Sequence, residues 1–252
     1  MKPVVILLHG FALDSAMWDP QRRALAGMGY RVIAPDFPGF GSRAPWPREA
    51  CSMDSFADDV YSLIVREASG SAVVAGLSMG GYILLSLLRR HSDVIQAAML
   101  VDTQPAADTP QSREYRMAMV KAVEREGNEA MVAAMLPRLL SDSASDELKK
   151  YLTDMVRRQS PQGIIAAQLA MAARRDQTDL LSQLHVPVLI IVGAEDVITP
   201  PSIAADMKAK IPSARLVEIP GAGHMSNLQS PERVSEAMLE FLNSLSPQQN
   251  DD

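Results

Sequence analysis

The sequence has little cysteine and no long apolar run. Its one cysteine, Cys51, has no partner for an internal disulfide, and the small residues expected around a cysteine nucleophile are absent. The five apolar residues Val4 to Leu8, just before His9, are too few for a signal peptide or a membrane span. We therefore expect a cytoplasmic protein with no membrane partner.

Positive charge is also scarce. Lys plus Arg number 24 against 30 Asp plus Glu, and the net charge of -6 disfavours a nucleic-acid partner. The four histidines, at positions 9, 91, 185 and 224, show none of the short spacings of zinc ligands, so we expect no metal and no other cofactor. The rest of the composition, 47% hydrophobic and 21% charged, is that of an ordinary globular protein.

Short β-branched runs alternate along the chain with longer segments of helical period. Continuous apolar runs are typical of buried parallel strands, and the helices that connect them must cover both faces of the sheet. The predicted strands are Val4–Leu8, Arg31–Ala34, Ala72–Ala75, Ala97–Val101, Val188–Val192 and Arg215–Ile219. The predicted connecting helices are Ser15–Met28, Asp54–Ala68, Met79–Arg90, Pro201–Ile211 and Pro231–Leu245. We expect an α/β fold with a doubly wound, essentially parallel sheet of about six strands.

The alternation stops between Thr103 and His185, where the sequence has helical patterns and no convincing strand. Turn residues divide this segment into four predicted helices, Gln111–Glu126, Glu129–Leu140, Ser145–Arg158 and Pro161–Arg174. The pattern predicts two units. Residues 1–102 and 186–252 form an α/β core, and residues 103–185 form a helical cap inserted over the sheet.

The sharpest motif is Gly76-Leu77-Ser78-Met79-Gly80, between a predicted strand and a predicted helix. It matches the G-x-S-x-G nucleophile elbow, in which a serine sits on a strained strand-to-helix turn. Positions two before and two after the serine must lack bulk there, and Gly76 and Gly80 meet this requirement. The motif predicts that Ser78 is a nucleophile. Without partners, it would be an ordinary serine in a tight turn.

A serine nucleophile needs a base, and the base needs a carboxylate that holds its tautomer. Asp196 follows the predicted strand Val188–Val192, and His224 follows the strand Arg215–Ile219 in a glycine-rich loop. Parallel strands bring their carboxyl ends to one edge of the sheet, where ligands bind. The sequence therefore predicts a catalytic triad of Ser78, Asp196 and His224.

Competing interpretations exist for these partners. Glu195 is adjacent to Asp196, and Asp102 directly follows the strand Ala97–Val101, a position that supplies the triad acid in some hydrolases. Asp196 is favoured because of its loop context, but it can also be read as a helix-entry cap. His224 can be read as a solvated loop histidine.

Two backbone N–H groups are candidates for an oxyanion hole. His9-Gly10-Phe11 follows the first strand, and Met79 begins the helix after Ser78, where the helix dipole favours negative charge. We expect the Phe11 and Met79 N–H groups to point at the developing oxyanion. His9 is interpreted as a structural brace for the loop.

The predicted cap offers an apolar lining and no charge excess. Its flexible methionines can fill a core or form an adaptable acyl pocket; they are Met117, Met119, Met131, Met135, Met155 and Met171. Between Thr103 and His185 there are eleven Lys or Arg and eleven Asp or Glu. A net basic face for an acidic carrier protein is therefore not expected, and a small-molecule ester-type substrate is favoured.

These motifs resemble those of the α/β-hydrolase superfamily. The runs His9 to Asp14, Met17-Trp18, Val32 to Asp36 and Gly39-Phe40-Gly41 are similar to the bacterial carboxylesterase and 3-oxoadipate enol-lactonase group. The resemblance implies the same triad and oxyanion donors as above. The sequence also differs from most members of the superfamily. It begins at the strand before His9-Gly10, so we expect the sheet to lack the two leading strands that most members have.

The resemblance also disfavours several reactions that other members of the superfamily catalyse. Ser78 stands where epoxide hydrolases and haloalkane dehalogenases carry aspartate, and Met225 stands where hydroxynitrile lyases carry lysine, so those reactions are disfavoured. The leading prediction is a serine hydrolase that cleaves a carboxylic ester, lactone or thioester of a small molecule through an acyl-enzyme on Ser78. A slow or non-catalytic ligand receptor, a carbon–carbon bond hydrolase and a cofactor-free perhydrolase remain as alternatives.

Overall fold

The computed structural model describes residues 2–43 and 51–245. Its sheet has six strands, all parallel, in the order β2-β1-β3-β4-β5-β6. The strands are β1 (Val4–Leu8), β2 (Arg31–Ile33), β3 (Ala72–Leu77), β4 (Ile95–Val101), β5 (Val188–Gly193) and β6 (Arg215–Ile219). The predicted parallel sheet of six strands is confirmed.

Burial along the strands follows their place in the sheet. Every residue of β3 and β5 is buried, whereas β2 and β6, at the two edges, are partly exposed. β3 runs two residues beyond the predicted end at Ala75, because Gly76 pairs with Leu8 of β1 and Leu77 pairs with Val101 of β4. The strand pairing therefore continues to the residue directly before Ser78.

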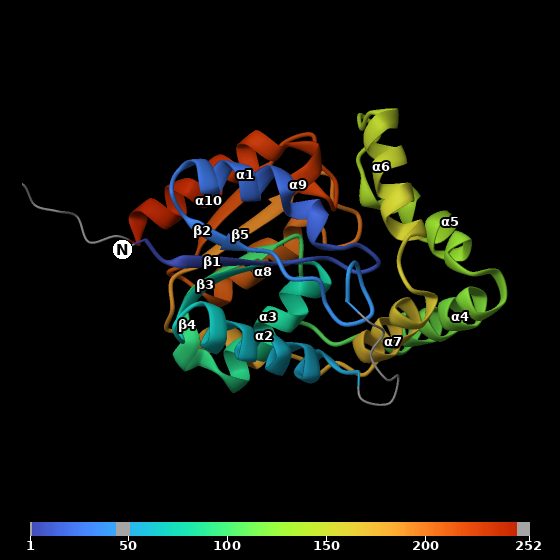
Figure 1. Ribbon diagram of the computed structural model, residues 1–252, viewed down its shortest axis with the longest axis horizontal. Helices are drawn as coiled ribbons and strands as arrows, with labels where there is room; N and C mark the ends of the chain where they lie inside the picture. The colour runs from blue at the N-terminus through green and yellow to red at the C-terminus, as the bar shows by residue number, and fades with distance from the viewer. Residues whose placement is uncertain (1, 44–50, 246–252) are drawn as a thin grey trace, which may run out of the picture.

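Helices cover both faces of the sheet (Figure 1). They are α1 (Asp19–Gly27), α2 (Met53–Glu67), α3 (Met79–Arg90), α8 (Pro201–Lys210), α9 (Ser226–Gln229) and α10 (Pro231–Ser244). Right-handed crossovers place α1 and α10 on one face and α2, α3 and α8 on the other. The core lies between these layers and the sheet.

The first predicted helix is divided in two. Ser15–Trp18 forms a 3-10 turn, η1, and α1 begins at Asp19. The division has a local cause, since the Asp14 side chain caps η1 by accepting the Ala16 N–H at 3.1 Å and Pro20 occupies the first turn of α1.

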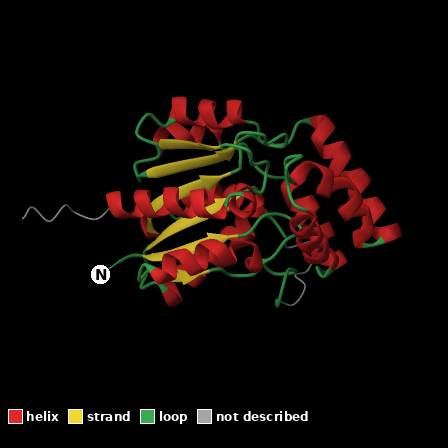
Figure 2. Ribbon diagram, turned by 90° about the horizontal axis from the view of Figure 1, so that it is seen from above, coloured by secondary structure: helices red, strands yellow, loops and turns green. Residues whose placement is uncertain are grey.

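Between β4 and β5 lie four further helices, and we call them the cap helices. They are α4 (Pro110–Glu126), α5 (Asn128–Leu139), α6 (Asp146–Arg157) and α7 (Pro161–Ala172), each within four residues of its predicted ends. Figure 2 shows that the arrowheads of the strands point toward these helices. The cap helices thus face the carboxyl edge of the sheet.

A partly buried ion pair joins the cap helices to the loop after β1. Arg158 Nε and Nη2 donate to the two carboxylate oxygens of Asp14, each at 2.7 Å, and Gln159 Nε2 adds a third hydrogen bond at 2.8 Å. The Asp14 side chain is 5% exposed and the Arg158 side chain 48%. Because the acid is buried and the contact is bidentate, this pair is stronger than an ordinary surface ion pair.

A second attachment joins the α5–α6 turn to the loop after β6. Ser141 Oγ donates to the Gly221 carbonyl at 2.9 Å, and the Gln229 side chain bonds both Ser141 and the Gly223 N–H. The Met225 N–H donates to the Leu139 carbonyl at 3.0 Å. The loop that carries residue 224 is therefore held partly by the cap helices.

Candidate active site

Ser78 lies between β3 and α3 with a strained backbone. Its φ of 53° and ψ of -114° are unusual for a residue with a side chain. Hydrogen bonds fix the turn on both sides, from the Ser78 N–H to the Val101 carbonyl at 3.0 Å and from Thr103 Oγ1 to the Ser78 carbonyl at 2.8 Å. Strain of about 1–3 kcal/mol is typical of such positions, and it persists because the surrounding structure determines the conformation.

The glycines of the motif are required by close backbone contacts. A Cβ on Gly76 would lie 2.3 Å from the Gly80 carbonyl oxygen, and a Cβ on Gly80 would lie 2.3 Å from the Leu8 carbonyl oxygen. Both distances are far inside van der Waals contact. The spacing that predicted the nucleophile elbow therefore has the expected steric cause.

The three residues of the predicted triad lie together in one hydrogen-bonded chain. Ser78 Oγ is 2.9 Å from His224 Nε2, and His224 Nδ1 is 2.7 Å from Asp196 Oδ2. His224 is 2% exposed, so it is not a solvated loop histidine. An ionised Asp196 accepts a hydrogen bond from Nδ1–H, and this tautomer leaves the Nε2 lone pair facing the serine hydroxyl, the arrangement that a general base requires.

Asp196 is held as a carboxylate by its neighbours. The Ile198 and Thr199 N–H groups donate to Oδ1 at 2.7 and 2.9 Å, and Thr199 Oγ1 donates to Oδ2 at 2.7 Å. Burial by itself raises the pKa of Asp196, but hydrogen bonds from His224 and Thr199 outweigh burial and leave the pKa below its ordinary value. Sequence reasoning missed Thr199, although an Asp with Thr three residues later is a common turn pattern.

The two competing acids lie elsewhere. Glu195 is exposed. Asp102 is buried, but its oxygens bind other groups: Oδ1 accepts the Gly193 N–H at 2.8 Å, while Oδ2 accepts Ser226 Oγ at 2.6 Å and the Ser226 N–H at 3.1 Å. Of the three carboxylates considered from the sequence, Asp196 is the one hydrogen-bonded to His224.

Asp102 connects the two loops that carry Asp196 and His224. Gly193 lies three residues before Asp196, and Ser226 lies two residues after His224. Burial raises the pKa of Asp102 to about 7, against the pull of His224 and of its hydrogen bonds, and the nearby charge of Asp196 adds to the rise. This bracing position was not predicted.

The predicted oxyanion donors border the serine. Phe11 lies in the turn after β1 and lines the same cavity as Ser78, and Met79 is the first residue of α3. His9 braces this turn, since its Nδ1 lies 2.8 Å from the Gly10 carbonyl and its Nε2 accepts the Phe37 N–H at 3.0 Å. Burial lowers the pKa of His9, so the ring is neutral and serves structure.

A cavity of about 450 Å³ opens above Ser78, between the sheet edge and the cap helices. This is within the usual range for small-molecule sites. On the core side it is lined by Phe11, Ser78, Tyr82 and His224, and on the cap side by Asp108, Tyr115, Arg116, Met131, Met135, Arg138, Gln168 and Met171. Of the six cap methionines, Met131, Met135 and Met171 line the cavity, whereas Met117, Met119 and Met155 are not among its described lining residues.

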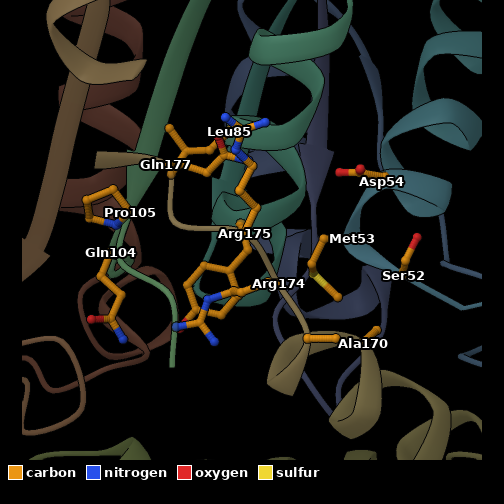
Figure 3. Close-up of a pocket in the computed structure, with 12 residues that line it drawn as sticks. Ser52, Met53, Asp54, Leu85, Gln104, Pro105, Ala170, Arg174, Arg175 and Gln177 are labelled. Carbon is orange, nitrogen blue, oxygen red and sulfur yellow. The ribbon is translucent and has the colours of Figure 1, made fainter. Parts of the chain in front are cut away.

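A smaller cavity of about 130 Å³ lies at the seam between α2, α3 and the end of α7 (Figure 3). Figure 3 shows Arg174 and Arg175 leaving the chain in different directions, with Ala170 of α7 nearby. Tyr82 and Gln104 line both cavities, and the Arg174 guanidinium lies 4.2 Å from the centre of the Tyr82 ring. This second cavity does not include Ser78 or His224 among its lining residues.

Within residues 2–43 and 51–245, no group of three or more His, Cys, Asp or Glu side chains is arranged to hold a metal ion. In the same ranges, no helix is both long and apolar enough to span a membrane. Cys51 is partly buried, and burial raises the pKa of its thiol to about 12, which is unlike that of a reactive cysteine.

The chain belongs to the α/β-hydrolase fold family, because the family model with that description matches residues 3–231. A solved structure of a thermophilic esterase from Thermogutta terrifontis, with malate bound, is 37% identical, covers 97% of this chain and 91% of that one, and has a TM-score of 0.94. The enol-lactonase from Burkholderia xenovorans LB400 is 26% identical with a TM-score of 0.88, covering 96% and 92% of the two chains.

Among curated sequences, the AB hydrolase superfamily protein YisY of Bacillus subtilis is 29% identical over 95% of this chain and 91% of its own length. The similarity to each of these proteins extends over nearly the full chain. The predicted family membership is therefore confirmed.

Proposed function

We propose that the protein is a serine hydrolase that cleaves a carboxylic ester of a small molecule through an acyl-enzyme on Ser78. The observation that carries the proposal is the chain of hydrogen bonds from Ser78 Oγ through His224 to Asp196, at 2.9 and 2.7 Å, beneath a cavity of about 450 Å³. The similarity to the Thermogutta esterase supports it.

The first half-reaction uses His224 as base and then as acid. His224 Nε2 accepts the Ser78 hydroxyl proton while Oγ attacks the ester carbonyl carbon. The resulting oxyanion accepts hydrogen bonds from the Phe11 and Met79 N–H groups, each of which typically contributes about 3 kcal/mol to the transition state. His224 then gives its proton to the departing alkoxide, and the alcohol leaves behind an acyl-enzyme.

The second half-reaction reverses these roles with water. His224 removes a proton from a water molecule, which attacks the acyl carbon, and the proton returns to Ser78 Oγ as the carboxylic acid leaves. Asp196 accepts the Nδ1–H throughout and stabilises the imidazolium, in agreement with its lowered pKa.

Residues 103–185 form, in this proposal, a cap that selects the substrate, while residues 1–102 and 186–252 carry out the chemistry. The cap side chains in the cavity supply its specificity, since reaction class and substrate identity are set by different parts of a site. A lactone is the second candidate substrate, and the similarity to the Burkholderia enol-lactonase favours it. The cytoplasmic location remains a prediction.

Labelling with a fluorophosphonate tests the mechanism directly. The reagent should modify Ser78 at one equivalent per chain, and p-nitrophenyl butyrate should be hydrolysed. Ser78→Ala should lose labelling and at least about 10⁴-fold in kcat. Ser62→Ala, an exposed serine on α2, is the matched control and should keep both.

Two outcomes would contradict the proposal. Full turnover by Ser78→Ala would show that the serine is not the nucleophile. Labelling of wild-type Ser78 combined with turnover of every ester and lactone below about one per minute, far below typical enzyme rates, would favour a ligand receptor.

A further inference from the structure

The charges that line the active-site cavity are unbalanced. Among its described lining residues the formally charged side chains are Asp108, Arg116 and Arg138, so two guanidinium groups face one carboxylate. The segment from Thr103 to His185 as a whole has eleven basic and eleven acidic residues. The balance of the whole segment therefore conceals a positive inner surface.

Asp108 is already paired with a third arginine behind the cavity wall. Arg174 Nη1 donates to Asp108 Oδ1, and both side chains are 4% exposed. Arg174 also donates to the Ala106 carbonyl at 2.8 and 3.1 Å and to the Met171 carbonyl at 3.0 Å. These contacts satisfy Arg174 and fix Asp108 in place.

Arg116 is a second cation on the same carboxylate. Its Nε donates to Asp108 Oδ2, and its Nη1 donates to Gln168 Oε1 at 3.0 Å. Its Nη2 has only a long contact of 3.4 Å with Asp108 Oδ1. Since guanidinium has five N–H donors, the Nη2 edge keeps donor capacity beside the cavity.

This arrangement lowers the stability of the folded chain but favours the binding of an anion. The Arg116 side chain is 17% exposed and shares the Asp108 carboxylate with Arg174, so the largely buried cluster carries an excess positive charge, which is costly. Neutral Gln168 holds the group in place without cancelling its charge. An anionic ligand would supply the missing charge.

Arg138 extends the positive surface to the cavity mouth. It lies at the end of α5, is exposed, and has no ion-pair partner in the part of the chain that the structure describes. A guanidinium there attracts an anion, and Arg116 can bind a carboxylate further in.

Resting on the hydrolase function proposed above, we propose that the natural substrate is an ester that also carries a free carboxylate, such as the monoester of a dicarboxylic acid. The ester group lies at Ser78, and the carboxylate is bound by Arg116 and Arg138 on the opposite wall of the cavity.

Three methyl esters of equal chain length test this charge selectivity: monomethyl adipate, methyl hexanoate and methyl 6-aminohexanoate. Monomethyl succinate and monomethyl suberate extend the test to shorter and longer spans. Wild type should show kcat/KM at least about tenfold higher for the best anionic ester than for its neutral counterpart, and the cationic ester should be the poorest.

Arg116→Gln and Arg138→Gln should each lower this anionic-to-neutral ratio, and the larger loss, about tenfold, should come from Arg116→Gln. Arg113→Gln is the matched control, because Arg113 is exposed on the same helix and does not line the cavity. It should leave the ratio unchanged. If Arg116→Gln fails to fold, the wild-type ratio and Arg138→Gln decide the question.

A wild-type enzyme that hydrolyses the neutral ester as well as the anionic ones, with a ratio unaffected by Arg138→Gln, would overturn the inference and leave the serine mechanism intact. Failure of the mechanism has a different signature, namely no fluorophosphonate label on Ser78 and no turnover of any of the esters.

Discussion

The active-site cavity has two walls that are built in different ways. The core wall consists of loops at the carboxyl ends of β1, β3 and β6, so strand pairing fixes where Phe11, Ser78 and His224 lie. The cap wall consists of side chains from the cap helices, such as Arg116 and Gln168, whose positions depend on helix packing. Strand topology alone therefore places Phe11, Ser78 and His224, whereas the lining of the opposite wall depends on side-chain contacts that topology leaves open.

Among the changes at the core wall, Asp196→Asn should lower kcat the most. An amide in place of the carboxylate donates to the imidazole and reverses the tautomer of His224, so we expect kcat to fall about 10⁴-fold with little change in the free energy of unfolding. Steady-state kinetics with p-nitrophenyl butyrate measure this loss. Glu195→Gln, one residue away and exposed, is the control and should keep wild-type kcat.

Asp102→Asn should lower activity less than Asp196→Asn does. Its amide nitrogen must face either the Gly193 N–H or the donors of Ser226, so one hydrogen-bonded loop is released and kcat/KM should drop about 10–100-fold. A loss as large as that of Asp196→Asn would mean that Asp102 takes part in the proton transfer itself.

The same variant gives a pH test. Burial raises the folded-state pKa of Asp102 from 3.8 to about 7, so between these values the folded chain binds this proton more readily than the unfolded chain. The stability that this protonation contributes is therefore lost as pH rises from about 4 to about 7. Wild type should therefore lose stability relative to Asp102→Asn between about pH 4 and about pH 7 in urea unfolding experiments. A constant or growing advantage of wild type over that range would show that the pKa is not raised.

Loss of the contact between Arg158 and Asp14, which attaches the cap helices to the loop after β1, should have the smallest effect on activity. Arg158→Gln leaves the buried Asp14 carboxylate without its bidentate partner, so we expect a loss of about 1–3 kcal/mol in the free energy of unfolding and a rise in KM without a comparable fall in kcat.

Arg157→Gln is the control for that attachment, because Arg157 pairs with Glu129 within the cap and both side chains are more than half exposed, at 51% and 61%. We expect a change within about 0.5 kcal/mol. Equal effects of the two variants would show that the Asp14 contact does not hold the cap wall.

The positions of the residues at the core wall could be predicted from the sequence because each of them follows a strand. Ser78, Asp196 and His224 come in the expected order, and parallel strands bring their carboxyl ends together whatever the details of packing. From the sequence, Asp196 was favoured over Asp102 by its loop context alone. Both follow strands, and only side-chain direction separates the residue that touches His224 from the one that braces its loop.

The sequence predicted the helices of the cap wall but not which of their side chains line the cavity. The helix bounds follow from turn residues and caps, but α7 is buried on nearly all sides, so its apolar pattern indicates no inward face. Arg116, Asp108 and Arg174 meet across a long stretch of sequence, and no local spacing marks them as a cluster. Charge summed over the segment was therefore a poor guide to the charge of its inner surface.

The contact between the α5–α6 turn and the loop of His224 constrains how new specificities can be engineered. The Leu139 carbonyl accepts the Met225 N–H, and a Cβ on Gly223 would lie 2.7 Å from the Ser141 nitrogen. A cap transplanted from a relative must therefore bring a turn that reproduces these contacts, or His224 will shift along with the graft. Recombination within α4, α5 and α7 that keeps residues 139–141 is the safer path to altered substrates.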